Sequence, residues 1–148
     1  TNMRDMAHNL QIKRVISPVV VADDTPAVGQ IIDRLGYDSL TYVIATGTLA
    51  DADATFAVLL EESDAANMAG SNAVADADMI SQTVGAAPEA AAGFQFDDDN
   101  EVRKLGYVGS KRYTRLTITP AGNGGDAPIT AVAVLGHPQA SPVKQAVA

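Results

Sequence analysis

The sequence predicts an all-β protein, built as an antiparallel β-sandwich for which a jelly roll is one candidate topology. Three observations lead to this fold class. The apolar runs are short, turn residues separate them, and the strand–helix alternation of a parallel α/β sheet is absent. At 148 residues the chain has the size of one domain with a core of its own. Short antiparallel strands in such a domain pack as two facing sheets.

Both ends of the chain read as extended arms around this domain. Residues 1–13 are polar and lack an apolar period, and residues 137–148 contain Pro138 and Pro142. The sandwich domain is therefore expected at residues 14–136. We also expect neighbouring subunits, and not the domain itself, to order the two arms.

The first strand is expected at residues 15–21, a β-branched run that contains Pro18. A proline within a strand is typical of a sheet edge or of an irregular start. The turn Asp23-Asp24-Thr25-Pro26 follows. A second apolar stretch covers residues 29–35 and is closed by Gly36.

Two clearly alternating runs follow, at residues 39–46 and 54–60, and the polar segment 47–53 joins them. A short loop between two β runs predicts a hairpin. One face of each run is apolar, which assigns it to the core. The residues on these faces are Leu40, Tyr42, Ile44, Phe56, Val58 and Leu60.

The segment 63–92 is the least regular, since eleven of its thirty residues are Ala, mixed with Gly, Asn, Asp and Ser. Alanine favours helix, but the glycines and Pro88 interrupt any long helix. We expect a long surface connection with a short β or helical turn near residues 74–80. Connections of this length often carry function.

The last strands are expected at residues 102–108, 113–119 and 129–135. The first two are predicted to form a hairpin through Gly109-Ser110. In the second, Leu116 and Ile118 point inward while Arg115 and Thr117 point outward. The third is apolar on both faces, which predicts a buried strand with Val132 and Val134 in the core.

Charges are sorted along the chain. Residues 35–102 contain no Lys or Arg but thirteen of the eighteen acidic residues, whereas residues 103–115 contain five of the ten basic residues and no acid. This basic block is either an interface patch or a solvated strand face that pairs with acidic loops of the same molecule. Its members are Arg103, Lys104, Lys111, Arg112 and Arg115.

Composition excludes several functions. The net charge of −8 argues against a general nucleic-acid binder, which needs a basic surface. Without Cys there is no disulfide, thiolate nucleophile or Cys-ligated metal, which fits a protein made in a reducing cytoplasm. The beginning of the sequence lacks the apolar core of a signal peptide, and no apolar run has the length of a membrane span, so no membrane partner is expected.

Candidate sites for chemistry are weak. Residues 97–101 contain Asp97, Asp98, Asp99 and Glu101, which could hold Ca²⁺, but their spacing does not match an EF-hand. The pairs Asp51/Asp53 and Asp76/Asp78 fit turn and cap roles better than a cation site. Gly109-Ser110-Lys111 fails the phosphate-loop pattern. His8 and His137 lack a catalytic context, so we expect no catalytic residue, metal or cofactor.

Two segments carry a resemblance to a known group. G-Y-V-G-S-K-R-Y-T-R-L-T-I-T-P at residues 106–120 and A-V-A-V-L-G-H-P at 131–138 resemble small structural proteins of tailed bacteriophages, similar to capsid decoration (cement) proteins. Weaker echoes are V-L-L-E-E-S-D at 58–64 and A-V-A-D-A-D-M-I at 73–80. These are strand-and-turn patterns, and the resemblance covers residues 28–143.

The resemblance implies a non-enzymatic virion protein on the capsid surface, made in the host cytoplasm. Its implied partners are the major capsid protein and further copies of itself, as a homo-oligomer. The alternative is a carbohydrate-binding or fibre-type β-sandwich adhesion module of the virion. Such modules display exposed aromatic side chains for stacking on sugars, and this chain has only four Tyr and three Phe.

Overall fold

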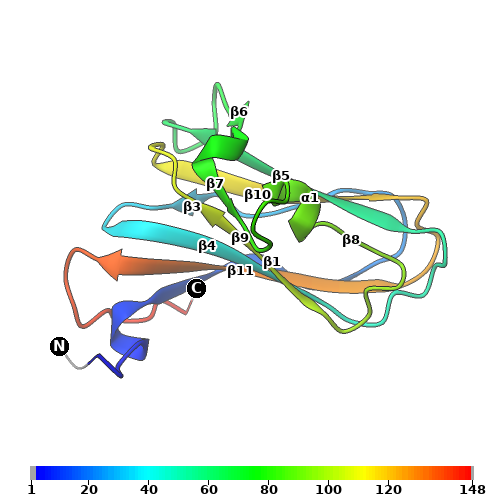
Figure 1. Cartoon of the computed structure of the whole chain (residues 1–148), viewed down its shortest axis with the longest axis horizontal. Coiled ribbons are helices and arrows are strands. Elements are labelled where there is room, and N and C mark those ends of the chain that lie inside the picture. The colour runs from blue at the N-terminus through cyan, green and yellow to red at the C-terminus, as the bar shows by residue number, and fades with distance from the viewer. Residues whose placement is uncertain (1–2, 148) are drawn as a thin grey trace.

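In the computed structural model, residues 3–147 form two antiparallel sheets packed face to face (Figure 1). Sheet A has the order β1 (Gln11–Val21), β11 (Ala127–Pro138), β4 (Tyr37–Thr46), β9 (Val102–Tyr107) and β7 (Met79–Ser81). Sheet B places β2 (Ala27–Val28) and β3 (Ile32–Asp33) beside β10 (Tyr113–Ala121), and then β5 (Thr55–Ser63). Two short strands pair with the far edge of β5, namely β6 (Asn72–Ala73) and β8 (Phe94–Gln95).

This strand order is that of a jelly roll, so the predicted fold class is confirmed. The long strands β1 and β4 both lie in sheet A. From β4 onward the long strands alternate, with β5 in sheet B, β9 in sheet A, β10 in sheet B and β11 in sheet A. Every pairing between them is antiparallel. A chain that wraps back and forth in this way closes both sheets around one core.

The two predicted hairpins are wrong. β4 pairs with β11 and β9, whereas β5 pairs with β10, so residues 47–54 cross from one sheet to the other. The connection 108–112 does the same between β9 and β10. Alternation along a strand reveals which face is buried, but it does not reveal which strand lies alongside.

The predicted inward faces are confirmed for β4, β5 and β10. Their apolar residues alternate into the space between the sheets, where the Phe56 and Phe94 rings stack at 4.7 Å and the Tyr42 hydroxyl hydrogen-bonds Thr114 at 2.6 Å. The core side chains of these strands are Leu40, Tyr42, Ile44, Phe56, Val58, Leu60, Leu116 and Ile118.

The face predicted for β11 is wrong, whereas Thr117 of β10 points outward as predicted but is more buried than expected. In β11 the buried residues are Ile129, Ala131, Ala133 and Leu135, while Val132 and Val134 lie half-buried on the outer face of sheet A. Because both faces of this strand are apolar, its pattern could not select the inner one. Thr117 lies opposite Val28 and Leu59 on the outer face of sheet B, yet it is only 9% exposed.

Proline positions agree with the sheet geometry. Pro18 lies in β1, which is the edge strand of sheet A, and the register with β11 shifts between Ile16 and Val19. The expectation of an edge or an irregularity at this proline is confirmed. The Pro128 carbonyl accepts the Gly47 N–H, so the backbone of Pro128 faces away from β1. Its missing N–H therefore removes no hydrogen bond to β1.

Segment 63–92 closes one side of the sandwich. It contains β6, the short 3-10 helix η2 (Asp76–Asp78), β7 and the helix α1 (Pro88–Ala92). α1 contacts β5 of sheet B and both β7 and β9 of sheet A, so it bridges the two sheets. The expected β and helical turns near residues 74–80 are present. Within the described residues, no helix is long and apolar enough to cross a membrane.

The segments predicted as arms lie against their own domain where the structure describes them; residues 1–2 and 148 lie outside that part. A 3-10 helix, η1 (Ala7–Asn9), precedes β1, which begins at Gln11, inside the predicted arm. The C-terminal segment turns back beside the start of β1 (Figure 1), where the Val143 N–H donates to the His8 carbonyl at 2.7 Å. The tail thus has partners within its own chain, contrary to the expectation that only neighbours order it.

Candidate functional site

Four connections gather acidic residues at one end of the sandwich, at the right of Figure 1. They are residues 22–26, 47–54, 96–101 and 122–126. We call this set of loops the acidic end. Its nine carboxylates belong to Asp23, Asp24, Asp51, Asp53, Asp97, Asp98, Asp99, Glu101 and Asp126.

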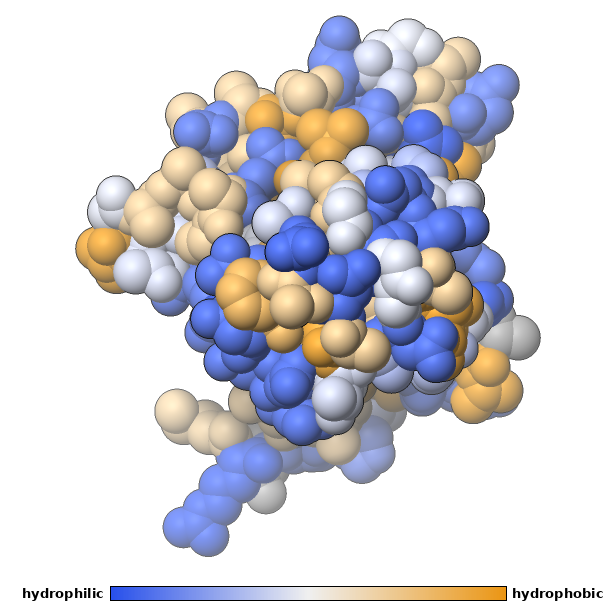
Figure 2. All heavy atoms as spheres, turned by 90° about the vertical axis from the view of Figure 1, so that its right-hand side faces the viewer, coloured by the Kyte–Doolittle hydropathy of each residue, from blue (hydrophilic) through white to orange (hydrophobic). Residues whose placement is uncertain are grey.

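The acidic end carries the whole formal charge of the chain. Arg103, at the start of β9, is its one cation, so nine carboxylates and one guanidinium give −8, equal to the net charge of the chain. The other nine acidic residues balance the other nine basic ones. Figure 2 looks onto this end and shows mainly hydrophilic residues with a few apolar ones between them.

Many of these carboxylates hold loop backbone in place. Asp24 accepts the Asn123 N–H at 2.7 Å, Asp51 accepts the Gly124 N–H at 2.7 Å, and Asp99 accepts the Leu49 N–H at 2.8 Å. Backbone hydrogen bonds also lower the pKa values of Asp23 and Asp51, because they stabilise the ionised carboxylate. The turn and cap role expected for the Asp51/Asp53 pair is therefore what Asp51 shows.

The candidate calcium ligands are used differently. Arg103 bonds Asp98 at 3.1 Å and Glu101 at 2.7 Å, and Asp99 caps the neighbouring loop. Within residues 3–147, no group of three His, Cys, Asp or Glu side chains is arranged to hold a metal ion. Asp76 and Asp78 lie in η2, away from the acidic end.

Four residues of the basic block form ion pairs within the molecule. Lys111 lies 2.7 Å from Asp64, and Arg115 lies 3.4 Å from Glu61. Arg112 grips Asp33 with two hydrogen bonds of 2.8 Å, which lower the pKa of the Asp33 carboxyl. With the Arg103 pairs above, these contacts match the alternative in which the block pairs with acidic loops of its own chain.

The basic block does not form one patch. Lys104 is exposed on the outer face of sheet A, whereas Arg115 lies on the outer face of sheet B. Arg103 belongs to the acidic end, and Lys111 and Arg112 lie in the connection at the opposite end. The block is divided because the connection between β9 and β10 crosses from sheet A to sheet B.

The two histidines lie near the arms. His8 contacts Asp5 at 2.5 Å on an exposed turn. His137 contacts the Ser39 hydroxyl at 2.9 Å, and among the described residues no carboxylate bonds this histidine. A serine and a histidine alone lack the third group that orients the base in a nucleophilic triad.

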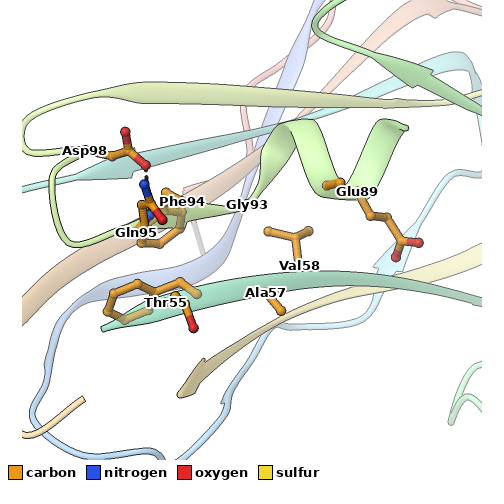
Figure 3. Close-up of a pocket in the computed structure, with 10 residues that line it drawn as sticks. Thr55, Ala57, Val58, Glu89, Gly93, Phe94, Gln95 and Asp98 are labelled. Carbon is orange, nitrogen blue, oxygen red and sulfur yellow. Dashed lines mark hydrogen bonds between the residues drawn. The ribbon is translucent and has the colours of Figure 1, made fainter. Parts of the chain in front are cut away.

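A pocket of about 380 Å³ lies along the free edge of β5, between α1 and β8 (Figure 3). Glu89 of α1 lines one side and Phe94, Gln95 and Asp98 line the other, with Val58 of β5 between them. Glu89 accepts the Leu60 N–H at 2.7 Å, and burial raises the pKa of its carboxyl. This site was not predicted from the sequence. Pro88 followed by Glu89 is a helix-start signal that could have placed the acid there.

No protein-family model and no curated protein matches the chain. Among solved structures, it is similar to the PBSX exported protein XepA, with a TM-score of 0.55 and 16% identity over 100% of this chain. The chain spans 42% of that protein. Weaker likenesses are to the SPBc2 prophage-derived protein YomS, with a TM-score of 0.43, 12% identity and 83% and 94% coverage of the two chains. A xylan-binding module gives a TM-score of 0.40, 12% identity and coverage of 92% and 95%. At these identities the likeness to XepA shows the fold.

Proposed function

We propose that this chain is a structural protein of a tailed-phage particle, and specifically a decoration protein that binds the outer surface of the head and stabilises it. The observation that carries this proposal is the match of the whole chain to part of the PBSX exported protein. It agrees with the sequence resemblance at residues 106–120 and 131–138. Under this proposal the partners are the major capsid protein and further copies of the chain.

The charge distribution supports an oriented attachment. A molecule whose net charge lies at one end is steered toward a complementary surface with that end leading. The outer faces of the sheets then remain free for contacts between copies. Lys104 is exposed there, and among the described residues its ammonium has no ion pair.

The basic block is proposed as a contact with acidic residues of a neighbour. Because Lys111, Arg112 and Arg115 already pair with Asp64, Asp33 and Glu61, a neighbour has to compete with these partners. Exposed ion pairs are worth about 0–1 kcal/mol each, so such an exchange requires several pairs at once.

The alternative, a carbohydrate-binding or fibre-type adhesion module, lacks support in the surface. Stacking on sugars needs exposed aromatic rings, whereas Tyr42, Tyr107, Phe56 and Phe94 are buried in the core. Among the described residues Phe96 is the most exposed Phe, at 40%. A glycan array with the purified chain separates the two functions, because an adhesion module binds a subset of glycans and a decoration protein binds none.

The decisive experiment compares particles with and without this protein. A protein that binds only the assembled shell stabilises it by mass action, so particles lacking it should lose their contents at lower temperature and at low salt. Adding back the purified chain should restore stability, and cryo-EM should show it on the head. Equal survival of the two kinds of particle would refute the stabilising role.

A further inference from the structure

The free edge of β5 presents alternate backbone groups. β10 runs along the other edge of β5, with Phe56 opposite Pro120, Val58 opposite Ile118 and Leu60 opposite Leu116. Leu60 points its backbone away from β10, since its N–H donates to Glu89 and its carbonyl accepts the Val74 N–H at 2.9 Å. Residues two apart in a strand point their backbone groups to the same edge. Phe56 and Val58 therefore also face the free edge.

Of these three residues, Val58 has an unpaired backbone. β8 pairs with Phe56 through Phe94, and Glu89 and Val74 satisfy Leu60. The short strands β6 and β8 leave a gap between them, and no hydrogen bond in the described part of the chain fills it at Val58. Val58 is only 7% exposed, and it lines the pocket beside Glu89. The N–H and C=O of Val58 have no protein partner and face this pocket, so a ligand that satisfies both gains binding energy.

The chain itself shows which chemistry fits such a pair. On the free edge of β1, the side-chain carboxamide of Gln145 accepts the Ile12 N–H at 3.0 Å and donates to the Ile12 carbonyl at 2.6 Å. One carboxamide thus satisfies both edge groups of one strand residue. A primary carboxamide carries its acceptor and one donor on the same side, which is the complement of an extended residue's N–H and C=O.

We propose that the pocket beside β5 binds the side-chain carboxamide of an Asn or Gln of a polypeptide partner. Its oxygen accepts the Val58 N–H, and its NH₂ group donates to the Val58 carbonyl. The pocket, about 380 Å³, is large enough for the stem of that side chain as well, which meets the apolar walls at Phe94 and Ala90. This site is independent of the capsid role proposed above.

Amide-resolved NMR of the ¹⁵N-labelled chain tests the site, with acetamide as the probe. Without probe, the Val58 amide should exchange with solvent faster than those of Ala57 and Leu59, which face β10. Acetamide should shift the Val58 amide proton and slow its exchange. Methyl acetate, which cannot donate, and N-methylacetamide, whose donor and acceptor point to opposite sides, should each give a smaller shift at equal concentration.

A pair of variants controls for non-specific effects. Ala90 lines the pocket and is exposed, so Ala90→Leu should fill the space without disturbing the core and should abolish the acetamide shift. Ala91→Leu, on the next position of α1 and outside the pocket lining, should keep it. The spectra of both variants also report whether they fold.

Three results would overturn the proposal. One is a Val58 amide as protected as Leu59 without any probe, since the gap would then be filled. Another is an acetamide shift that survives in Ala90→Leu. The third is a shift with N-acetylglycine N-methylamide but none with acetamide, which would assign the site to a main-chain strand. None of these depends on whether the chain binds a phage head.

Discussion

The acidic end and the opposite end of the sandwich use their carboxylates in different ways. At the acidic end Asp24, Asp51 and Asp99 accept loop N–H groups, so the negative charge is retained while the backbone is ordered. At the opposite end Asp33 and Asp64 pair with Arg112 and Lys111, so charge is cancelled. The partner of each aspartate therefore decides the local charge. A backbone N–H leaves the negative charge in place, whereas a Lys or Arg side chain neutralises it.

The core between the two ends sets the scale for every other effect. Ile118 is fully buried, so Ile118→Ala should cost about 2–5 kcal/mol of a total stability of about 5–15 kcal/mol. Thr117→Ala, on the outer face, should cost about 1 kcal/mol or less for the lost methyl and hydroxyl groups. Chemical denaturation of both variants measures the difference. A larger loss for Thr117→Ala would mean that the strand register is wrong.

The next largest effect should fall on the acidic end. Asn123 is 5% exposed, and its side-chain NH₂ donates to the carbonyls of Val21 and Asp23 at 3.2 Å each. Asn123→Ala leaves both acceptors without this donor and should cost about 1–3 kcal/mol. At the opposite end Arg112→Ala should cost about 0–1 kcal/mol. Equal losses in urea denaturation would remove the distinction between structural and surface contacts.

Acidification should separate hydrogen-bonded from desolvated carboxyls. The pKa of Asp51 is lowered, so its contribution is present above the ordinary value of 3.8 and is lost as pH falls through the folded-state pKa. Glu89 has a raised pKa, so the folded state gains relative stability as pH falls through that pKa toward 4.5.

Two isosteric variants test these opposite signs. Asp51→Asn should make the loss of folding stability below pH 3.8 smaller. Glu89→Gln should remove the gain in folding stability that the natural chain shows as pH falls toward 4.5. Unfolding free energies measured across this pH range check both, and a shift in the same direction for the two variants would contradict the assignment of causes.

The smallest effect on the isolated domain should come from the basic block. Charge reversal at Arg112 and Arg115 breaks pairs that are exposed or half-exposed, each worth about 0–1 kcal/mol. If the block contacts a neighbour, the same variant should bind particles less well and with a steeper salt dependence. Lys104→Glu is the matched change at a residue without an ion pair among the described residues. If both variants occupy particles as fully as the natural chain, the basic block has only its intramolecular role.

The candidate sites show where prediction from sequence stopped. The segregation of charge along the chain was visible, but the acidic end also draws in Asp23, Asp24 and Asp126, which lie far from the acidic stretch in sequence. The basic block was contiguous in sequence and is divided among two sheet faces and both ends in space. The pocket depends on a gap between β6 and β8, which no local pattern encodes.

The sequence by itself determined the fold class and the buried face of each alternating strand, because a period of two is a local property of the chain. It also determined the irregularity at Pro18, since a missing N–H acts locally. Only the tertiary structure decided that β4 pairs with β11 and not with β5. It also decided which of the two apolar faces of β11 is buried in the core. Strand partners in a jelly roll are distant in sequence, so their register follows from the closing of the whole core and not from any one turn.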